Sequence, residues 1–264
     1  MDKDIYEAIV EARRAGERLA LATIIARKGS TPRRDAAKML IYPDGRQIGT
    51  VGGGCMEAEI CREALAAMSS EKAQILKFDL TADDAEDSGL ICGGTMEVYV
   101  EPIVPDPTLF IFGAGHIGRS VATIAKIVGF KVAIIDDRIK YASQERFPNA
   151  DAIYVESWET VFERLPITDS SFLLIATRGH QFDLTCLRFA LRTPARYIGL
   201  LGSRRKIQLF FEKLAAEGFA PGDFSRVRAP VGIEIGSETP EEIAVSIAAE
   251  LIAVRKKVGI QRSS

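Results

Sequence analysis

The chain has 264 residues, 47% of them hydrophobic and 27% charged, with a net charge of −2 and an isoelectric point near 5.9. These values are typical of a globular protein of one large or two ordinary domains, and they exclude a general attraction to nucleic acid or to anionic membranes. Because there is no signal-peptide segment and no apolar run near the roughly 18 residues of a membrane span, we expect a cytoplasmic protein that binds neither nucleic acid nor membrane.

The first hundred residues have the pattern of an α+β domain. The hydrophobic periodicity predicts, in chain order, a helix at 4–15, strands at 19–26, 38–42 and 47–51, a helix at 56–68, and strands at 74–78 and 96–103. Two prolines in Val104-Pro105-Asp106-Pro107 interrupt the pattern, since proline continues neither a ladder nor a helix well. We therefore predict an N-terminal domain over residues 1–104 and a second domain over 107–264.

The second domain alternates short apolar strands with helical segments. Strands are predicted at 109–112, 131–135, 152–155, 172–176 and 197–200. Thr239-Pro240-Glu241-Glu242 has the residues of a capping box with proline at the first helical position, so the last helix should begin there. Continuous apolar strands separated by helices indicate a parallel sheet covered on both faces. The predicted fold class is α/β, an α+β domain followed by a Rossmann-like, doubly wound parallel sheet.

Three consecutive glycines precede a cysteine in the first domain, at Gly52, Gly53, Gly54 and Cys55. Such a run lets amide N–H groups converge on an anion, and a thiol near a helix N-terminus favours the thiolate that binds soft metals or accepts sulfur. We therefore expect an anion site with Cys55 as a metal contact; a small buried residue in a tight turn is the alternative. Cys92, which also precedes glycines, is a weaker candidate.

The segment from Gly113 through Gly115 and His116 to Gly118 follows a predicted strand and opens a helix, which is the context of a dinucleotide-binding loop. The glycines would allow a tight turn, close approach to a pyrophosphate and close helix packing. Asp136 ends the next strand, where an acid binds an adenosine ribose and favours NAD over NADP. The alternative is that these glycines only shape the fold.

The only two histidines, His116 and His180, both follow predicted strands of the second domain, at the edge where open α/β sheets bind ligands. Both are candidate site residues, although polar loop residues without chemistry would fit equally well. Gly202 and Ser203, which precede three basic residues, form a second candidate anion site, with a solvated helix start as the alternative.

Taken together, these motifs resemble the XdhC/CoxI family, accessory proteins that mature xanthine dehydrogenase and related molybdenum hydroxylases. The motifs are Gly29-Ser30-Thr31-Pro32-Arg33, Gly52 to Glu57, Cys92-Gly93-Gly94, Gly113 to His116, Asp136-Asp137-Arg138, Arg146-Phe147-Pro148, Tyr197 to Ser203, Pro230-Val231-Gly232 and Thr239 to Ala244. The resemblance covers nearly the whole chain.

The resemblance implies a protein that binds molybdenum cofactor, protects it during sulfuration and delivers it to an apo molybdenum hydroxylase. A cysteine desulfurase-type sulfurase would be a second partner. The residues also permit another function, an NAD-dependent oxidoreductase acting on a small carbonyl or hydroxy substrate, with His180 and Asp183 as acid–base groups. A homo-oligomer is expected because symmetric dimers are the commonest assembly.

Overall fold

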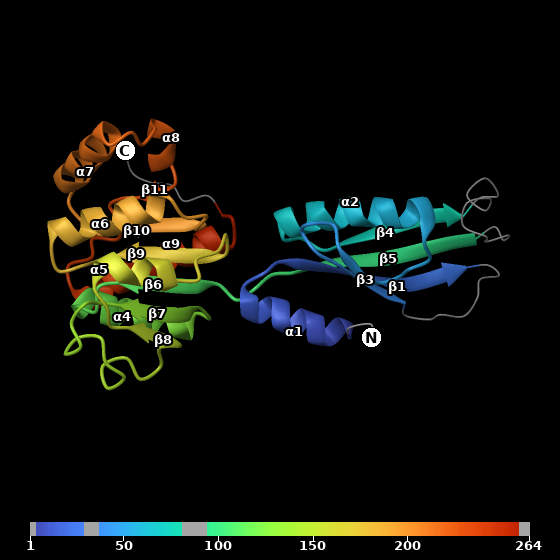
Figure 1. Cartoon of the computed structure of the whole chain (residues 1–264), viewed down its shortest axis with the longest axis horizontal. Coiled ribbons are helices and arrows are strands. Elements are labelled where there is room, and N and C mark those ends of the chain that lie inside the picture. The colour runs from blue at the N-terminus through green and yellow to red at the C-terminus, as the bar shows by residue number, and fades with distance from the viewer. Residues whose placement is uncertain (1–3, 29–36, 81–93, 259–264) are drawn as a thin grey trace. The chain divides into compact units, whose positions relative to one another are not determined.

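The computed structural model describes residues 4–28, 37–80 and 94–258, and the chain divides into two compact units, Met1–Pro105 and Asp106–Ser264 (Figure 1). The predicted motif at Gly29–Arg33 and the candidate Cys92 lie outside the described residues.

The N-terminal unit contains an antiparallel sheet of five strands in the order β3-β2-β1-β5-β4. The strands are β1 (Leu19–Lys28), β2 (Lys38–Ile41), β3 (Gln47–Gly49), β4 (Gln74–Leu80) and β5 (Gly94–Ile103). Helices α1 (Ile5–Ala15) and α2 (Gly54–Ser70) lie on opposite faces of this sheet (Figure 1). The alternation of β1 explains the two faces, since Leu19 and Leu21 pack with α1 whereas Ala20 and Ala22 pack with α2.

The C-terminal unit contains a parallel sheet of six strands in the order β11-β10-β9-β6-β7-β8. The strands are β6 (Thr108–Phe112), β7 (Lys131–Ile135), β8 (Ala152–Tyr154), β9 (Ser171–Ile175), β10 (Tyr197–Leu200) and β11 (Val227–Arg228). The predicted mixed α/β class is confirmed. The sixth strand was not predicted, because its two residues are too short to form an apolar run.

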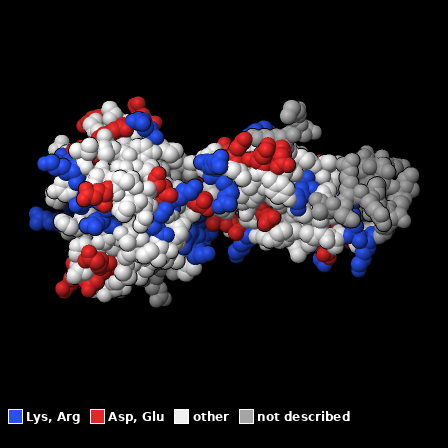
Figure 2. Space-filling view, turned by 90° about the horizontal axis from the view of Figure 1, so that it is seen from below, with Lys and Arg blue, Asp and Glu red and all other residues white. Residues whose placement is uncertain are grey.

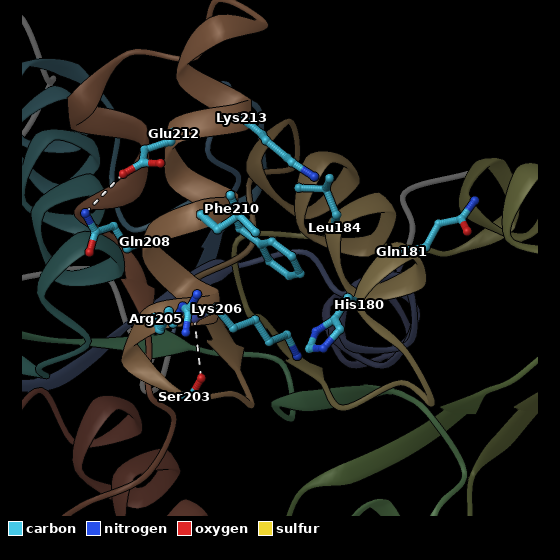
Figure 3. A pocket seen from close by; sticks show the side chains of 11 residues that line it. His180, Gln181, Leu184, Ser203, Arg205, Lys206, Gln208, Phe210, Glu212 and Lys213 are labelled. Carbon is cyan, nitrogen blue, oxygen red and sulfur yellow. Dashed lines mark hydrogen bonds between the residues drawn. The ribbon is translucent and has the colours of Figure 1, made fainter.

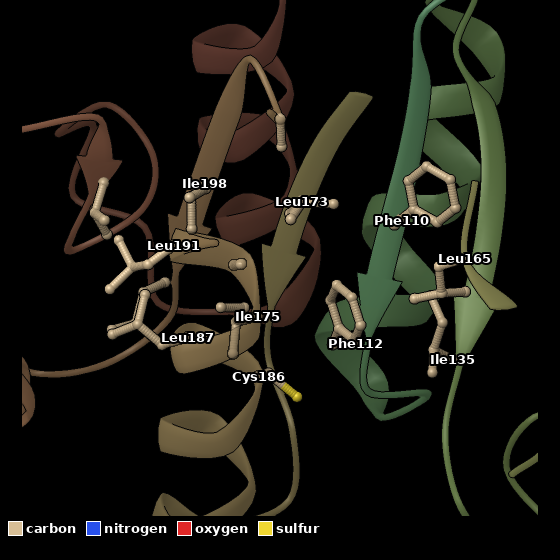
Figure 4. Close-up of a cluster of buried hydrophobic side chains, with 14 of the residues drawn as sticks. Phe110, Phe112, Ile135, Leu165, Leu173, Ile175, Cys186, Leu187, Leu191 and Ile198 are labelled. Carbon is tan, nitrogen blue, oxygen red and sulfur yellow. The ribbon is translucent and has the colours of Figure 1, made fainter. Parts of the chain in front are cut away.

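Helices cover both faces of the parallel sheet. They are α4 (His116–Ile127), α5 (Trp158–Val161), η2 (Phe162–Arg164), α6 (His180–Leu191), α7 (Arg204–Ala216), α8 (Pro221–Phe224) and α9 (Pro240–Arg255). One buried cluster joins the sheet to α5, α6 and α7, and Figure 4 shows part of it around Phe112, Ile175 and Leu187. A second cluster packs α4 and α9 against the other face.

The strand order places β6 and β9 side by side at the centre of the sheet, with β6 leading to α4 on one face and β9 leading to α6 on the other. The chain therefore reverses its direction of winding between these two strands. In doubly wound folds, a ligand binds beyond the carboxyl ends of the strands at such a point.

Candidate functional site

The loop between β6 and α4 is packed tightly against its neighbours. Gly113 has φ +119°, a conformation that favours glycine, and a Cβ added there would lie 2.1 Å from the carbonyl oxygen of Ala176. A Cβ at Gly118 would lie 2.1 Å from the carbonyl oxygen of Gly113. Both glycines are therefore required by the packing of the loop against the β9–α6 loop and its own helix.

Gly115 differs, because no packing contact requires a glycine there. It is the N-cap of α4 with φ −73° and ψ −169°, and an added Cβ would have no heavy atom within 4 Å. No side chain caps the helix at this residue, so the amide N–H groups of the first turn receive no side-chain acceptor from the N-cap. Such an end can hold a phosphate, and the missing Cβ leaves room for it.

Asp136, which directly follows β7, holds the loop between β6 and α4 by a hydrogen bond to its backbone. Its side chain is 2% exposed and accepts hydrogen bonds from the Ala114 amide at 2.8 Å and from the Arg138 guanidinium at 2.8 Å. Burial opposes ionisation, but the Arg138 and backbone hydrogen bonds outweigh it, so the pKa of Asp136 lies below its ordinary value. The neighbouring Asp137 pairs with Arg178 at 2.8 Å. Ribose binding by Asp136 stays a prediction.

The two histidines occupy equivalent positions at the carboxyl edge of the sheet. His116 is the first residue of α4 and His180 is the first residue of α6, and the N-caps Gly115 and Gly179 provide no side-chain cap. Both histidines are exposed. Because β6 and β9 are adjacent, the structure brings both helix starts to the same edge of the sheet.

Asp183, in the first turn of α6, connects the loop before this helix to α7. It is 2% exposed, and its carboxylate accepts hydrogen bonds from the Thr177 amide at 3.0 Å, the Thr177 hydroxyl at 2.7 Å and the Lys206 ammonium at 2.5 Å. The carboxylate therefore holds the β9–α6 loop against α7. Its predicted acid–base role stays a prediction, since its hydrogen bonds go to the protein itself.

A cavity of about 800 Å³ lies between α6 and α7 (Figure 3). His180 and Ser203 both contribute to its lining, whereas Gly202 does not. Ser203 is the N-cap of α7, and its hydroxyl accepts a hydrogen bond from the Lys206 amide at 3.4 Å. The cavity thus adjoins the second candidate anion site.

Cys55 is the second residue of α2, which has Gly53 as its N-cap, and its thiol is exposed. Gly52, Gly53 and Gly54 all have positive φ, of 143°, 86° and 70°. The backbone therefore turns as expected for a glycine run and presents Cys55 at the helix start.

The turn is held by Glu57, the last residue of the motif that begins at Gly52; Glu57 was not among the predicted site residues. Its carboxylate accepts hydrogen bonds from the Thr50 hydroxyl at 2.5 Å, the Val51 amide at 3.1 Å and the Gly53 amide at 3.0 Å. Burial raises the pKa of Glu57, but these hydrogen bonds lower it by more, so the pKa lies below its ordinary value. Two amides near the predicted anion site therefore already bind this carboxylate.

The other described cysteines are less accessible. Cys61 is half-buried, and burial, with a smaller contribution from Glu57, raises the pKa of its thiol. Cys186 is buried in the core, which raises its pKa well above the ordinary value. Within residues 4–28, 37–80 and 94–258, no group of three or more His, Cys, Asp or Glu side chains could hold a metal ion. Metal binding by Cys55 stays a prediction.

The distribution of surface charge and the lengths of the helices indicate whether nucleic acid or a membrane could be a partner. On the face shown in Figure 2, basic and acidic side chains are interspersed within each unit, so the described residues form no continuous basic surface there. No described helix is both long enough and apolar enough to cross a membrane.

Comparison with known proteins gives two family matches. Residues 109–251 match the XdhC Rossmann domain, and residues 12–79 match the XdhC and CoxI family. A solved structure described as a xanthine dehydrogenase from Bacillus halodurans is 25% identical, covers 98% of this chain and 97% of that chain, and superimposes with a TM-score of 0.54.

Three curated proteins are similar in sequence. The uncharacterized protein YqeB of Escherichia coli is 38% identical over 89% of this chain, which spans only 43% of that relative's length. A probable xanthine dehydrogenase component of Bacillus subtilis is 26% identical over 92% of this chain and 95% of its own length. The molybdenum cofactor insertion chaperone PaoD of Escherichia coli is 24% identical over 96% of this chain and 88% of its own length. With one family model matching more than half of its residues and a second matching its N-terminal unit, this chain belongs to the XdhC and CoxI family.

Proposed function

We propose that this protein binds molybdenum cofactor, protects it while its terminal oxo ligand is exchanged for sulfur, and delivers it to an apo molybdenum hydroxylase. The protein would act in the cytoplasm with a cysteine desulfurase-type sulfurase as its second partner. The name of one relative, a molybdenum cofactor insertion chaperone, supports this assignment, as does the name of the probable xanthine dehydrogenase component.

The observation that carries the proposal is the open start of α4 at Gly115. The cofactor carries a phosphate on its pterin, and the uncapped amides of α4 suit a phosphate. Because the packing at Gly113 and Gly118 fixes the loop, these amides are oriented before a ligand arrives. A preorganised site loses less entropy on binding.

In the N-terminal unit, Cys55 is a separate candidate contact for molybdenum or for the transferred sulfur. A thiolate binds molybdenum or accepts a sulfur atom, and this thiol is exposed at the second residue of α2. Glu57 would act as a positioning residue, because its three hydrogen bonds fix the turn that presents Cys55.

The test is to express the protein in a host that makes the cofactor and to purify it anaerobically. Molybdenum is measured by mass spectrometry, and pterin by fluorescence after oxidation. Wild type should carry both near stoichiometry, Cys55→Ala should lose most of the molybdenum, and the matched control Cys61→Ala on the same helix should retain it. Absence of both from wild type would overturn the proposal, and NAD-linked turnover in the same preparation would favour an oxidoreductase.

A further inference from the structure

The cavity between α6 and α7 combines positive charge with an apolar wall. Its basic side chains are His180, Arg205, Lys206 and Lys213, and its apolar ones are Leu184, Leu209 and Phe210. Glu212 is its one acidic lining residue, and the carboxylate accepts a hydrogen bond from Gln208 at 3.0 Å. The lining is therefore suited to an anion that also carries an apolar or aromatic part.

Lys206 provides the best-fixed charge in this cavity. Its ammonium has three N–H donors, of which one binds the Asp183 carboxylate and a second binds the Leu201 carbonyl at 3.0 Å. The third donor remains for a ligand. Figure 3 shows the ammonium pointing towards His180, and it lies 5.5 Å from the centre of the Phe210 ring.

The other basic groups that line the cavity, His180, Arg205 and Lys213, are available to bind a ligand. The His180 imidazole lies edge-on to Phe210, with 6.4 Å between ring centres, and it has no hydrogen-bond partner among the residues that the structure describes. Arg205 and Lys213 are exposed and likewise form no ion pair within the described ranges. Since Asp183 already neutralises Lys206, the additional positive charge of Arg205 and Lys213 is left for a ligand.

This cavity is separate from the glycine loop, because none of residues 113–118 lines it. Helix α7 begins after Ser203, and Lys206 lies in its first turn, so the positive end of the helix dipole lies at the same end of the cavity as the ammonium. Phe210 packs beside both Lys206 and His180 but is itself only 2% exposed, so the apolar surface open to a ligand comes from Leu184 and Leu209.

We propose that this cavity is a second ligand site, which binds a phosphate monoester carried on a planar heterocycle. The phosphate lies between Lys206 and His180, and the heterocycle packs against Leu184 and Leu209. A dianionic phosphate matches several cationic donors better than a carboxylate does. A nucleoside monophosphate and a pterin phosphate share this chemistry. The site goes beyond the proposed function, which uses the glycine loop and Cys55.

The two histidines of the chain allow a direct test. The full chain is labelled at histidine, freed of molybdenum cofactor, and titrated with adenosine monophosphate, with a pterin phosphate and with unphosphorylated adenosine. His116→Gln and His180→Gln assign the two imidazole signals. At least one of the two phosphates should shift the His180 signal, and the preferred one identifies the source of the ligand. A pterin phosphate that also occupies the glycine loop should shift His116 as well, whereas the His180 shift reports the second site. Adenosine alone should bind at least about tenfold more weakly than adenosine monophosphate, if that is the preferred ligand.

Variants of the basic residues test the phosphate position. Arg205→Gln and Lys213→Gln should each weaken binding about two- to fivefold, as for exposed charges, and Lys206→Gln by roughly tenfold or more. Lys140→Gln, an exposed lysine outside the cavity, is the matched control and should bind as wild type does. The first two substitutions are at exposed residues and keep the test valid if Lys206→Gln does not fold.

Several results would overturn the second site. They are an unchanged His180 signal with both phosphates, a shift of His116 alone, and wild-type affinity in the Arg205 and Lys213 variants. Because this titration uses protein without molybdenum, its failure leaves the cofactor measurement untouched, and the reverse also holds.

Discussion

The three glycines of the loop between β6 and α4 should respond very differently to alanine. At Gly113, alanine would adopt φ +119° and place its Cβ 2.1 Å from a backbone oxygen. Backbone strain of about 1–3 kcal/mol and overpacking of about 1–3 kcal/mol add to about 2–6 kcal/mol of lost stability. For a unit of this size, that lowers the melting temperature by about 4 °C or more.

At Gly115 the same substitution meets nothing within 4 Å and φ is already negative. Replacing a glycine N-cap by alanine weakens capping slightly and reduces the entropy of the unfolded chain, so the stability should stay within about 1 kcal/mol of wild type. The methyl group would nevertheless occupy the space where a phosphate approaches the amides, so most of the copurified molybdenum and pterin should be lost.

Thermal and urea denaturation of Gly113→Ala and Gly115→Ala, together with their cofactor content, check both halves of this reasoning. If Gly113→Ala were as stable as wild type, the packing argument would be refuted. If Gly115→Ala kept its full cofactor content, the amides of α4 would not be the phosphate site.

Three further predictions concern charged groups and thiols. Iodoacetamide should modify Cys55 in the native protein long before Cys186, because Cys55 is exposed whereas Cys186 is buried with a raised pKa; a time course by peptide mass spectrometry measures both, and equal rates would contradict the structure. Because the folded-state pKa of Glu57 is lowered, its contribution to stability is present above the unfolded pKa of about 4.3 and is lost as the pH falls through the lower folded value. Thermal melts followed by circular dichroism should show this loss of stability in wild type and a smaller loss in Glu57→Gln. Identical pH profiles of the two proteins would argue against the three hydrogen bonds. Lys206→Met should lower the free energy of unfolding by about 3–5 kcal/mol, since it leaves the buried Asp183 carboxylate without its cation. Arg188→Met, which breaks the more exposed pair with Glu217, should lower it by less than about 1 kcal/mol. Similar losses for the two variants in urea denaturation would be inconsistent with this difference in burial.

The start of the last helix shows what can be predicted from residues that are neighbours in the sequence. Thr239-Pro240-Glu241-Glu242 predicts a capped helix, and the Thr239 hydroxyl accepts a hydrogen bond from the Glu242 amide at 3.2 Å. The Glu242 carboxylate accepts one from the Thr239 amide at 3.0 Å in return. This prediction is confirmed because all the atoms involved lie within one turn of the chain.

The site residues show what could not be predicted from neighbouring residues alone. Sequence placed His116 and His180 after strands, but only the strand order makes those two strands neighbours. Glu57 was missed because its partners Thr50, Val51 and Gly53 reach it only when positive φ values at the glycines bend the backbone. No residue pattern shows that this carboxylate will occupy those amides.

The sequence by itself thus determined the period of each element, the caps and the glycine loop, since these depend on neighbours a few residues apart. It also determined the alternation of strands and helices, and with it the parallel sheet. Only the tertiary structure decided the pairing of Asp183 with Lys206, which are 23 positions apart, and the cavity between α6 and α7, whose lining comes from two separate helices. Such contacts depend on which buried surfaces pack together, and the packing of the whole unit sets that choice.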